Sequence, residues 1–488
     1  MLFNSIEFAV FFPLVFIGYW FVVNRNLKLQ NLFILAASFL FYGWWNWRFL
    51  ALLASGCIIN YFIGIGLTNL QNKAKRRWLL WAALIYNLGL LVVFKYLNFF
   101  IESFSTAFTF LGGNISSGSL NIVLPVGISF YTFQALGYII EVYRKNVTPA
   151  RDFISFSAFV SFFPLILAGP IERATHLLPQ FYGKRTFEYS KATDGLRQIL
   201  WGLFKKIVIA DNCAEYANII FNNAADYSGS SLVLGALFYT VQIYADFSGY
   251  SDIAIGVSRL LGFDIIRNFN NPYFSLNVAD FWRRWHIALS SWFRDYLFTP
   301  LSIKIRSWGT TGVVFSFFVT FLLCGLWHGA NYTFIVWGGL HGLALGWDVF
   351  SFRVRKKVKR KMNPGLYNFF SWCITMVFIV FTWIFFRAEN LHQAISYING
   401  VFNGLLQKSS YVETYNLVSW NKSVGFSIFP ILLLFITIEW LGRRQGHPLV
   451  YLEKMSYLFL RWFFYIIILI IIFYWGNYNE NVFIYFQF

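Results

Sequence analysis

The stretch FWRRWHIALSSWFRDYLF, residues 281–298, places charges and one imidazole among tryptophan and phenylalanine side chains. Only 12% of the chain is Asp, Glu, Lys or Arg, so this concentration of polar groups is unusual for it. Imidazole titrates near neutrality, which makes His286 a candidate for proton transfer. Read as a helix, the stretch brings Asp280 within ion-pairing distance of Arg283 and Arg284, three and four residues later.

Two interpretations of this stretch follow from its composition. Charge at membrane depth is costly and tends to face a wet cavity or a charged partner, which favours a polar cavity approached from the cytoplasm. An amphipathic helix at the membrane surface, with Trp and Arg as ordinary anchors, fits the same residues. The spacing does not decide between them.

A second candidate is FLLCGLWHGANY, residues 321–332, where His328 ends an apolar run. Glycines at 325 and 329 let another backbone or a ligand come close to it. The position suits proton transfer, although a hydrogen-bonded packing role would explain it as well. Cys324 precedes His328 by one helical turn, so a Cys–His nucleophile is also geometrically possible. No third group to orient such a pair is visible.

Two carboxylates lie within the apolar segment YADFSGYSDIAIG, residues 244–256. Asp246 and Asp252 could pair with the arginines of residues 281–298, order a substrate, or form a buried network of their own. His341, in another apolar run, is expected to pack or to line the same cavity as His328.

Long apolar runs must position all of these residues. The chain has 488 residues, of which 58% are hydrophobic, against about 45–50% in a soluble domain. Runs of about 20 apolar residues can each span a membrane. The sequence therefore predicts an all-α polytopic membrane protein that forms one domain over residues 1–488. About 11–12 spans are expected, with the candidates at 6–23, 32–47, 49–67, 78–100, 122–143, 196–212, 232–257, 313–327, 333–350, 367–386, 424–441 and 458–475.

The segment 153–180 differs from these spans, because its apolar part is short and basic residues flank it on both sides. A segment that leaves and returns on one side of the membrane is re-entrant. We therefore expect 153–180 to enter the membrane without crossing it.

The net charge of +18 falls mostly in short loops between apolar runs, as in cytoplasmic loops of membrane proteins. We therefore expect contact with membrane lipid and no nucleic-acid partner. The basic run 353–361 is read as a cytoplasmic anchor, with binding of anionic lipid or a phosphate-bearing substrate as the alternative. The four cysteines are scattered, and no metal-ligand spacing is visible, so no metal is expected.

The segments DFWRRWHIALSSWFRDYLFTPL and GLWHGANYTFIVWGGLHG resemble the membrane-bound O-acyltransferase superfamily. The similarity is to its bacterial branch of the alginate O-acetyltransferase membrane-subunit type, and LPVGISFYTFQALGYIIEVYR and FFPLILAGPIER agree with it. It covers most of the chain, with a core at about residues 120–395. The resemblance implies a ring of helices around a central funnel, in a multi-pass protein of the cell inner membrane.

The resemblance also implies roles for individual residues. The family's catalytic histidine corresponds to His328, which would act as general base toward the acceptor hydroxyl or briefly carry the acyl group. The family's second histidine or asparagine corresponds to His286, which would orient or polarise the thioester. A cytoplasmic acyl thioester, acetyl-CoA or an acyl carrier, would enter beside the arginines as co-substrate, with no bound cofactor. The candidate substrate-binding residues are Arg283, Arg284, Arg294, Asp280 and Asp246.

The expected reaction moves an acetyl group across the membrane for O-acetylation of an extracytoplasmic polysaccharide, such as an alginate-like exopolysaccharide. The group would pass to the glycan directly or through a periplasmic hydrolase-fold partner protein. Peptidoglycan O-acetylation and D-alanylation of teichoic acid are alternatives within the same enzyme class. A non-catalytic glycan or lipid transporter would also suit broken helices and intramembrane charge, but no paired inverted halves are visible.

Overall fold

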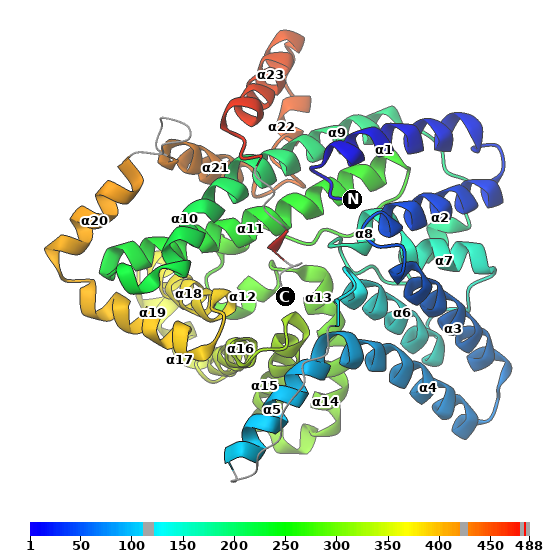
Figure 1. Cartoon of the computed structure of the whole chain (residues 1–488), viewed down its shortest axis with the longest axis horizontal. Helices are drawn as coiled ribbons and strands as arrows, with labels where there is room; N and C mark the ends of the chain where they lie inside the picture. Colours follow the sequence, from blue (N-terminus) through cyan, green and yellow to red (C-terminus); the bar gives the residue numbers. More distant parts are fainter. Residues whose placement is uncertain (111–121, 420–427, 479–482, 485–488) are drawn as a thin grey trace. The chain divides into compact units, whose positions relative to one another are not determined.

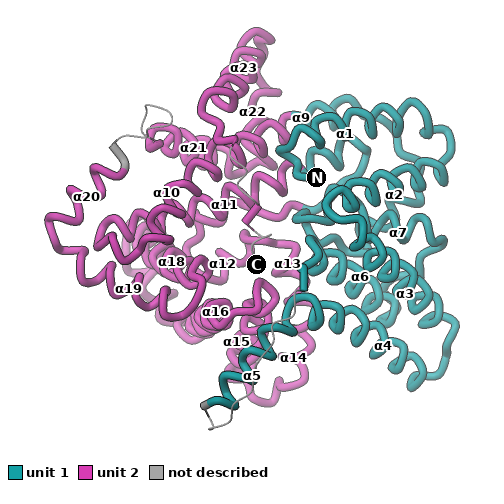
Figure 2. The backbone as a smooth tube through the Cα atoms, viewed as in Figure 1, with its two compact units in different colours: residues 1–196, 254–266 teal, residues 197–253, 267–488 magenta. Residues whose placement is uncertain are grey.

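The computed structural model describes residues 1–110, 122–419, 428–478 and 483–484, and every regular element in them is a helix (Figure 1). This confirms the predicted all-α class. The chain divides into two compact units, shown in Figure 2. Unit 1 comprises Met1–Leu196 and Ala254–Ile266, and unit 2 comprises Arg197–Ile253 and Arg267–Phe488. That both units form one membrane domain stays a prediction.

Six helical segments of the described residues are long and apolar enough to cross a membrane, so the chain is polytopic. They are Phe49–Asn69, Lys73–Thr109, Gly229–Leu260, Arg306–His328, Pro364–Arg387 and Leu458–Trp475. Four further apolar helices are shorter, namely Ile6–Val22, Leu27–Gly43, Phe153–Ile166 and Phe429–Gly442. In the part of the chain that the structure describes, six helical segments are thus both long enough and apolar enough to cross a membrane, fewer than the 11–12 spans expected from the sequence.

The difference in number has local causes. The predicted span 122–143 contains only the 16-residue helix α6, Ile128–Tyr143, because Gly127 adopts a left-handed conformation (φ 75°) directly before it. The predicted span 196–212 combines part of α9, Tyr189–Leu203, with the π-helical turn η4, Phe204–Ala210. Residues 424–427 of the predicted span 424–441 lie outside the described residues.

Unit 1 is built mainly from α1 (Ile6–Ile17), η1 (Gly18–Val22), α2 (Leu27–Gly43), α3 (Phe49–Asn69), α4 (Lys73–Leu91), η2 (Val92–Tyr96), α5 (Leu97–Phe110), α6, α7 (Phe153–Ser161), α8 (Phe163–Ile166) and the 3-10 turn η3 (Leu178–Phe181). Asn26 and Asn72 start α2 and α4 by accepting hydrogen bonds from the first free backbone N–H groups of these helices. In the predicted re-entrant segment, α7 and α8 are short and almost entirely buried.

Unit 2 contains α10 (Asp211–Asn222), most of α11 (Gly229–Leu260), α12 (Val278–Trp282), α13 (Ile287–Phe293), η7 (Arg294–Phe298), α14 (Thr299–Lys304), α15 (Gly309–His328), α16 (Tyr332–Phe350), α17 (Phe352–Lys361), α18 (Pro364–Arg387), α19 (Leu391–Gly404), α20 (Lys408–Ser419), α21 (Phe429–Gly442), α22 (Val450–Glu453) and α23 (Leu458–Trp475). The short turns η5 (Ala224–Asp226), η6 (Pro272–Phe274) and η8 (Arg306–Trp308) connect them.

The hairpin of α15 and α16 is the closest helix pair of unit 2. A Cβ atom on Gly325 would overlap the carbonyl oxygen of Phe334, and one on Gly338 would overlap that of Phe321. Side chains larger than hydrogen would therefore push the two backbones apart. Asn331 starts α16 by accepting a hydrogen bond from the N–H of Thr333. The hairpin thus fixes the position of the last residue of α15, His328.

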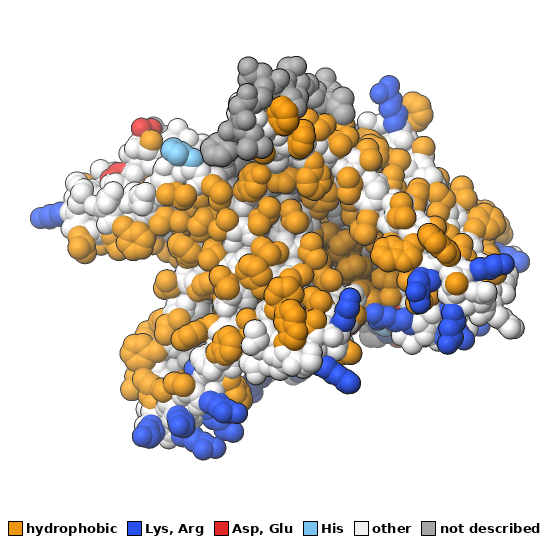
Figure 3. Space-filling view, turned by 90° about the horizontal axis from the view of Figure 1, so that it is seen from below, with side chains coloured by type: hydrophobic (Ala, Val, Ile, Leu, Met, Phe, Trp, Pro, Cys, Tyr) orange, Lys and Arg blue, Asp and Glu red, His pale blue; other side chains and the backbone are white. Residues whose placement is uncertain are grey.

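The surface carries large apolar side chains, as expected of helices that contact lipid. In Figure 3 hydrophobic side chains cover much of the displayed face, and Lys and Arg gather at its edges. None of the apolar window of α23 is buried against the rest of the chain. The basic run 353–361 forms the exposed helix α17. Exposed apolar helices and exposed basic segments are both typical of membrane proteins.

Candidate active site

The two histidines singled out by the sequence lie on one aromatic cluster of unit 2. The ring of His286 is 6.0 Å from that of Trp327, and the same indole ring is 4.9 Å from His328, measured between ring centroids. His286 is 0% exposed and His328 3% exposed. Two imidazoles that are distant in the sequence therefore share one neighbour in a water-poor enclosure.

Helices α16 and α18 complete the enclosure around His328. The ring centroids of Trp337 and Phe386 lie 5.1 and 5.0 Å from that of His328. Trp383 stacks on Trp337 at 5.9 Å and also lies 5.1 Å from Trp285. The sequence motifs pointed to the histidines but not to Trp337, Trp383 and Phe386, whose role depends on how α16 packs against α18.

His286 does not lie within a helix, so the helical reading of 281–298 is wrong at this point. Helix α12 ends at Trp282 and α13 begins at Ile287, while His286 between them has a left-handed backbone (φ 43°, ψ 55°). Such a conformation persists in a non-glycine residue only when its surroundings hold it. The backbone oxygen of Asn268 accepts a hydrogen bond from the N–H of Ile287 at 2.8 Å, which helps to stabilise this conformation.

Burial lowers the pKa of His286 to about 3. Removing the ring from water disfavours the imidazolium form, because the low-dielectric interior does not solvate the charge. The ring is therefore neutral in the enclosure and keeps one nitrogen lone pair as a proton acceptor.

The predicted ion pairs around Asp280 are present. Its carboxylate oxygen lies 3.1 Å from Nε of Arg284 and 3.8 Å from Nη2 of Arg283. Arg294 pairs with its neighbour Asp295 at 2.8 Å. The side chains of Arg283 and Arg294 are 71% and 64% exposed. These cations are therefore accessible to a charged ligand, whereas the histidines are enclosed.

Asp246 and Asp252 pair with two lysines and not with the arginines of 281–298, which was one of the three alternatives. Lys206 Nζ lies 3.0 Å from Asp246 and 2.8 Å from Asp211. Lys205 Nζ lies 2.5 Å from Asp252. The alternative of a buried pairing network is what the structure shows. The segment FKKIVIAD could have indicated these pairs, because two adjacent lysines in an apolar run require anionic partners.

His341 lies in the same region of unit 2 and is 0% exposed. Its Nδ1 accepts a hydrogen bond from the indole Nε1 of Trp282 at 3.1 Å. An indole can only donate, so Nδ1 of His341 carries no proton and Nε2 carries it. Within the described part of the chain, neither this Nε2–H nor the indole N–H of Trp337 has a hydrogen-bond partner. Both are buried donors that a bound carbonyl could satisfy.

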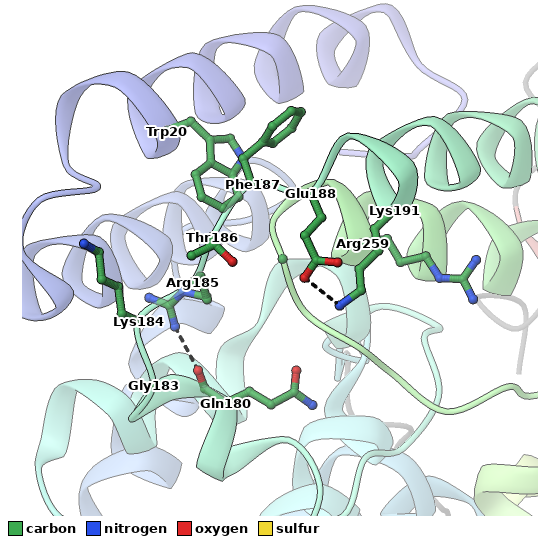
Figure 4. A pocket seen from close by; sticks show the side chains of 11 residues that line it. Trp20, Gln180, Gly183, Lys184, Arg185, Thr186, Phe187, Glu188, Lys191 and Arg259 are labelled. Atoms are coloured by element: carbon green, nitrogen blue, oxygen red, sulfur yellow. Dashed lines mark hydrogen bonds and ion pairs between the residues drawn. The ribbon is translucent and has the colours of Figure 1, made fainter.

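A cavity of about 230 Å³ lies in unit 1 and includes none of the predicted site residues. Three of its cations have partners: Figure 4 shows Lys191 bound to Glu188 and Arg185 donating to the carbonyl of Gln180, and Arg259 pairs with Asp194. Arg185 also donates to the side chains of Gln30 and Asn31. Arg185 therefore fixes the loop before α9.

Within residues 1–110, 122–419, 428–478 and 483–484, no group of three or more His, Cys, Asp or Glu side chains is placed to hold a metal ion. The expectation of a reaction without metal stays a prediction.

Known proteins are similar to this chain over the region that forms the enclosure. The model of the membrane-bound O-acyltransferase (MBOAT) family matches residues 147–387, which include both histidines. The chain is 37% identical to the probable alginate O-acetylase of Pseudomonas putida over 91% of this chain and 88% of that protein. It is 34% identical to the peptidoglycan O-acetyltransferase of Helicobacter pylori, covering 92% and 90% of the two chains. The teichoic acid D-alanyltransferase of Bacillus subtilis is 30% identical over 56% of this chain and 71% of its own length.

Proposed function

Because the chain belongs to the membrane-bound O-acyltransferase family, we propose that it takes an acetyl group from cytoplasmic acetyl-CoA and delivers it to a hydroxyl of an extracytoplasmic polysaccharide. Family membership makes the chain a multi-pass membrane acyltransferase, which removes the alternative of a non-catalytic transporter. The donor, the acceptor, the inner-membrane location and the roles of individual residues are the proposal.

One observation carries the assignment of the site: His286 and His328 contact the same indole ring, that of Trp327. Acyl transfer to a hydroxyl needs a base for the hydroxyl proton and donors for the charge that develops on the carbonyl oxygen. The buried histidines His286 and His328 are candidates for the first. The N–H groups of Trp337 and His341 are candidates for the second.

The proposed reaction is a direct transfer with His328 as general base. A ring nitrogen of His328 removes the hydroxyl proton while the hydroxyl oxygen attacks the carbonyl carbon of the thioester. The C–O bond forms, the C–S bond breaks, and the leaving thiolate takes the proton back from His328. His286 orients the reacting groups. The exposed Arg283 and Arg294 are proposed to attract the phosphates of the donor, with Arg284 and Asp280 beside them.

Asp246 receives a different role from the one expected for it. Its carboxylate also accepts from the backbone N–H of Ile484 at 2.9 Å and is enclosed with Lys206. A group satisfied in this way holds helices together, so we assign it to structure rather than to substrate binding.

The acceptor is proposed from the names of the relatives. A probable alginate O-acetylase matches at 37% identity over most of both chains, which supports an alginate-like exopolysaccharide. The peptidoglycan O-acetyltransferase matches nearly as well and keeps peptidoglycan as the second candidate. The D-alanyltransferase matches a smaller part of the chain. The alternative route has a periplasmic hydrolase-fold partner, whose hydroxyl receives the acetyl group in place of the glycan hydroxyl and passes it on to the glycan.

Membrane vesicles test the donor and its side of entry. Inside-out inner-membrane vesicles that contain the protein should release free CoA from added acetyl-CoA, and right-side-out vesicles should not, because acetyl-CoA does not cross the membrane. The lumen of the inside-out vesicles is loaded with the glycan. Release only from right-side-out vesicles would overturn the proposed sidedness. Turnover of an acyl carrier protein thioester but not of acetyl-CoA would overturn the proposed donor.

Replacement of Cys324 tests the thioester-intermediate alternative. The Cys324 thiol is buried on α15 one turn before His328, and we assign it to packing. Cys324→Ala is therefore expected to keep CoA release within about threefold of wild type, since only a small packing change is made. A variant that reaches the membrane at normal amounts but releases no CoA would replace the direct transfer with a covalent cysteine intermediate.

A further inference from the structure

Asn268 binds the segment around His286 through both its side chain and its backbone. Its Oδ1 lies 3.0 Å from Nδ1 of His286 and accepts from the N–H of Ala288 at 3.3 Å. Its backbone oxygen accepts from Ile287, the residue between them. Asn268 and His286 are both 0% exposed. One asparagine thus binds the imidazole and the two backbone groups that follow it.

The orientation of the Asn268 amide follows from its other partners. Its Nδ2 donates to Oγ of Ser251 at 3.3 Å, on α11. A flipped amide would place its NH₂ group against the N–H of Ala288, donor facing donor. The oxygen therefore faces His286, and an oxygen can only accept. Nδ1 of His286 must then be the nitrogen that carries the proton.

We propose that Asn268 is a positioning residue that fixes His286 in the tautomer with the proton on Nδ1, leaving Nε2 as a hydrogen-bond acceptor in the active site. In this tautomer neutral His286 cannot donate a hydrogen bond from Nε2 to the thioester carbonyl. It can accept one from the acceptor hydroxyl or from the thiol. His286 could either orient the reacting groups or polarise the thioester carbonyl. The tautomer favours the first role, because Nε2 can accept a hydrogen bond from a hydroxyl or thiol but cannot donate one to the carbonyl.

His341 shows the opposite arrangement. Its Nδ1 faces the indole N–H of Trp282 and its proton lies on Nε2. Protonation of His341 would bring two N–H groups together, whereas a proton gained by His286 would still leave Nδ1–H facing an oxygen. The two partners, Asn268 and Trp282, thus make Nε2 of His286 a hydrogen-bond acceptor and Nε2 of His341 a hydrogen-bond donor.

The tautomer can be measured without any activity. The chain has six histidines, so ¹⁵N-histidine labelling and solid-state NMR in lipid bilayers give few signals, and His286→Gln identifies that of His286. The wild-type protein should show a protonated Nδ1 and an unprotonated Nε2 at this residue. A wild-type signal with the proton on Nε2 overturns the proposal whether or not any variant folds.

Two substitutions of Asn268 separate positioning from general support. Asn268→Ala removes the acceptor and should let the Nε2–H tautomer appear, whereas Asn268→Asp keeps an acceptor and should retain Nδ1–H. Asn212→Ala is the matched control, because Asn212 is a buried asparagine of the same unit whose amide donates to the carbonyls of Val208 and Trp475. The His286 signal should be unchanged in it. An unchanged signal in folded Asn268→Ala contradicts the proposal.

The catalytic consequence rests on the proposed function and is read separately by CoA release. Asn268→Ala should lower kcat by about 10–100-fold with little change in KM, as is found when a partner that orients a metal-ligating histidine is removed. Asn268→Asp should move the acid limb of the pH–rate profile to higher pH by about 1–3 pH units, because a carboxylate stabilises the imidazolium. An altered tautomer with unaltered turnover would overturn the role of His286 in catalysis and leave the tautomer assignment standing. Absence of CoA release from wild type would overturn the proposed donor alone.

Discussion

Replacing His328 with alanine is expected to abolish O-acetylation of the extracellular glycan. A histidine that acts as general base contributes about 10²–10⁴-fold to the rate, and His328 is 3% exposed, so bulk water does not reach its ring. His286→Ala should lower acetylation less, because orientation of a hydroxyl can be replaced in part. The measurement is ester acetate per sugar on secreted or wall glycan, beside the total amount of glycan.

A matched histidine replacement shows that the loss is specific. His392 is exposed on α19, outside the aromatic cluster, so His392→Ala should leave acetate per sugar unchanged. Protein level and membrane insertion should be normal in all three variants, and glycan export should continue. If His328→Ala instead left acetate per sugar unchanged and reduced the amount of glycan outside, the proposed chemical role of His328 would be wrong.

Replacing Lys206 with methionine is expected to have the largest effect on stability. Lys206 Nζ lies between the carboxylates of Asp211 and Asp246, and all three side chains are 4% exposed. Removing the cation leaves two buried carboxylates without it, and breaking a buried pair in this way costs about 3–5 kcal/mol. The measurement is the temperature at which half of the detergent-solubilised protein stays monodisperse.

An exposed lysine provides the comparison. Lys191 lies 3.0 Å from Glu188, with side chains that are 45% and 48% exposed. Lys191→Met should cost no more than about 1 kcal/mol, since water screens such a pair. Addition of Asp211→Asn and Asp246→Asn to Lys206→Met should recover part of the lost stability. Equal midpoints for the two lysine variants would show that the buried network contributes no more than a surface pair.

The helices and the two histidines could be predicted from local sequence. An apolar run determines a helix through its own composition, so the helices that contain 49–67 and 458–475 follow directly from the residues that form them. His328 was recognisable because it ends such a run between two glycines. Predictions of this kind need no knowledge of which segments meet in the folded protein.

Properties that depend on a distant partner could not be predicted in the same way. The turn at His286 exists because residues near Asn268 make hydrogen bonds to it. The sequence of 281–298 contains no sign of these distant partners. A buried network around Asp246 was one of the alternatives, but its partner Lys206 could not be named, because only the packing of the helices brings the two side chains together. Asn268 itself was missed, although NFNNPY has an unusual density of amide side chains for so apolar a chain.

The glycine contacts of α15 and α16 restrict how enzymes with this architecture could evolve toward larger acyl groups. Because Gly325 and Gly338 already bring the two backbones to their limit of approach, the hairpin cannot tighten, and any added side-chain atom there would displace His328 as well. The site would be enlarged more easily if smaller side chains replaced Trp383 and Phe386 on α18. Enzymes that differ in donor preference are therefore expected to differ in the residues of α18. The hairpin of α15 and α16 should vary little, because larger side chains do not fit there.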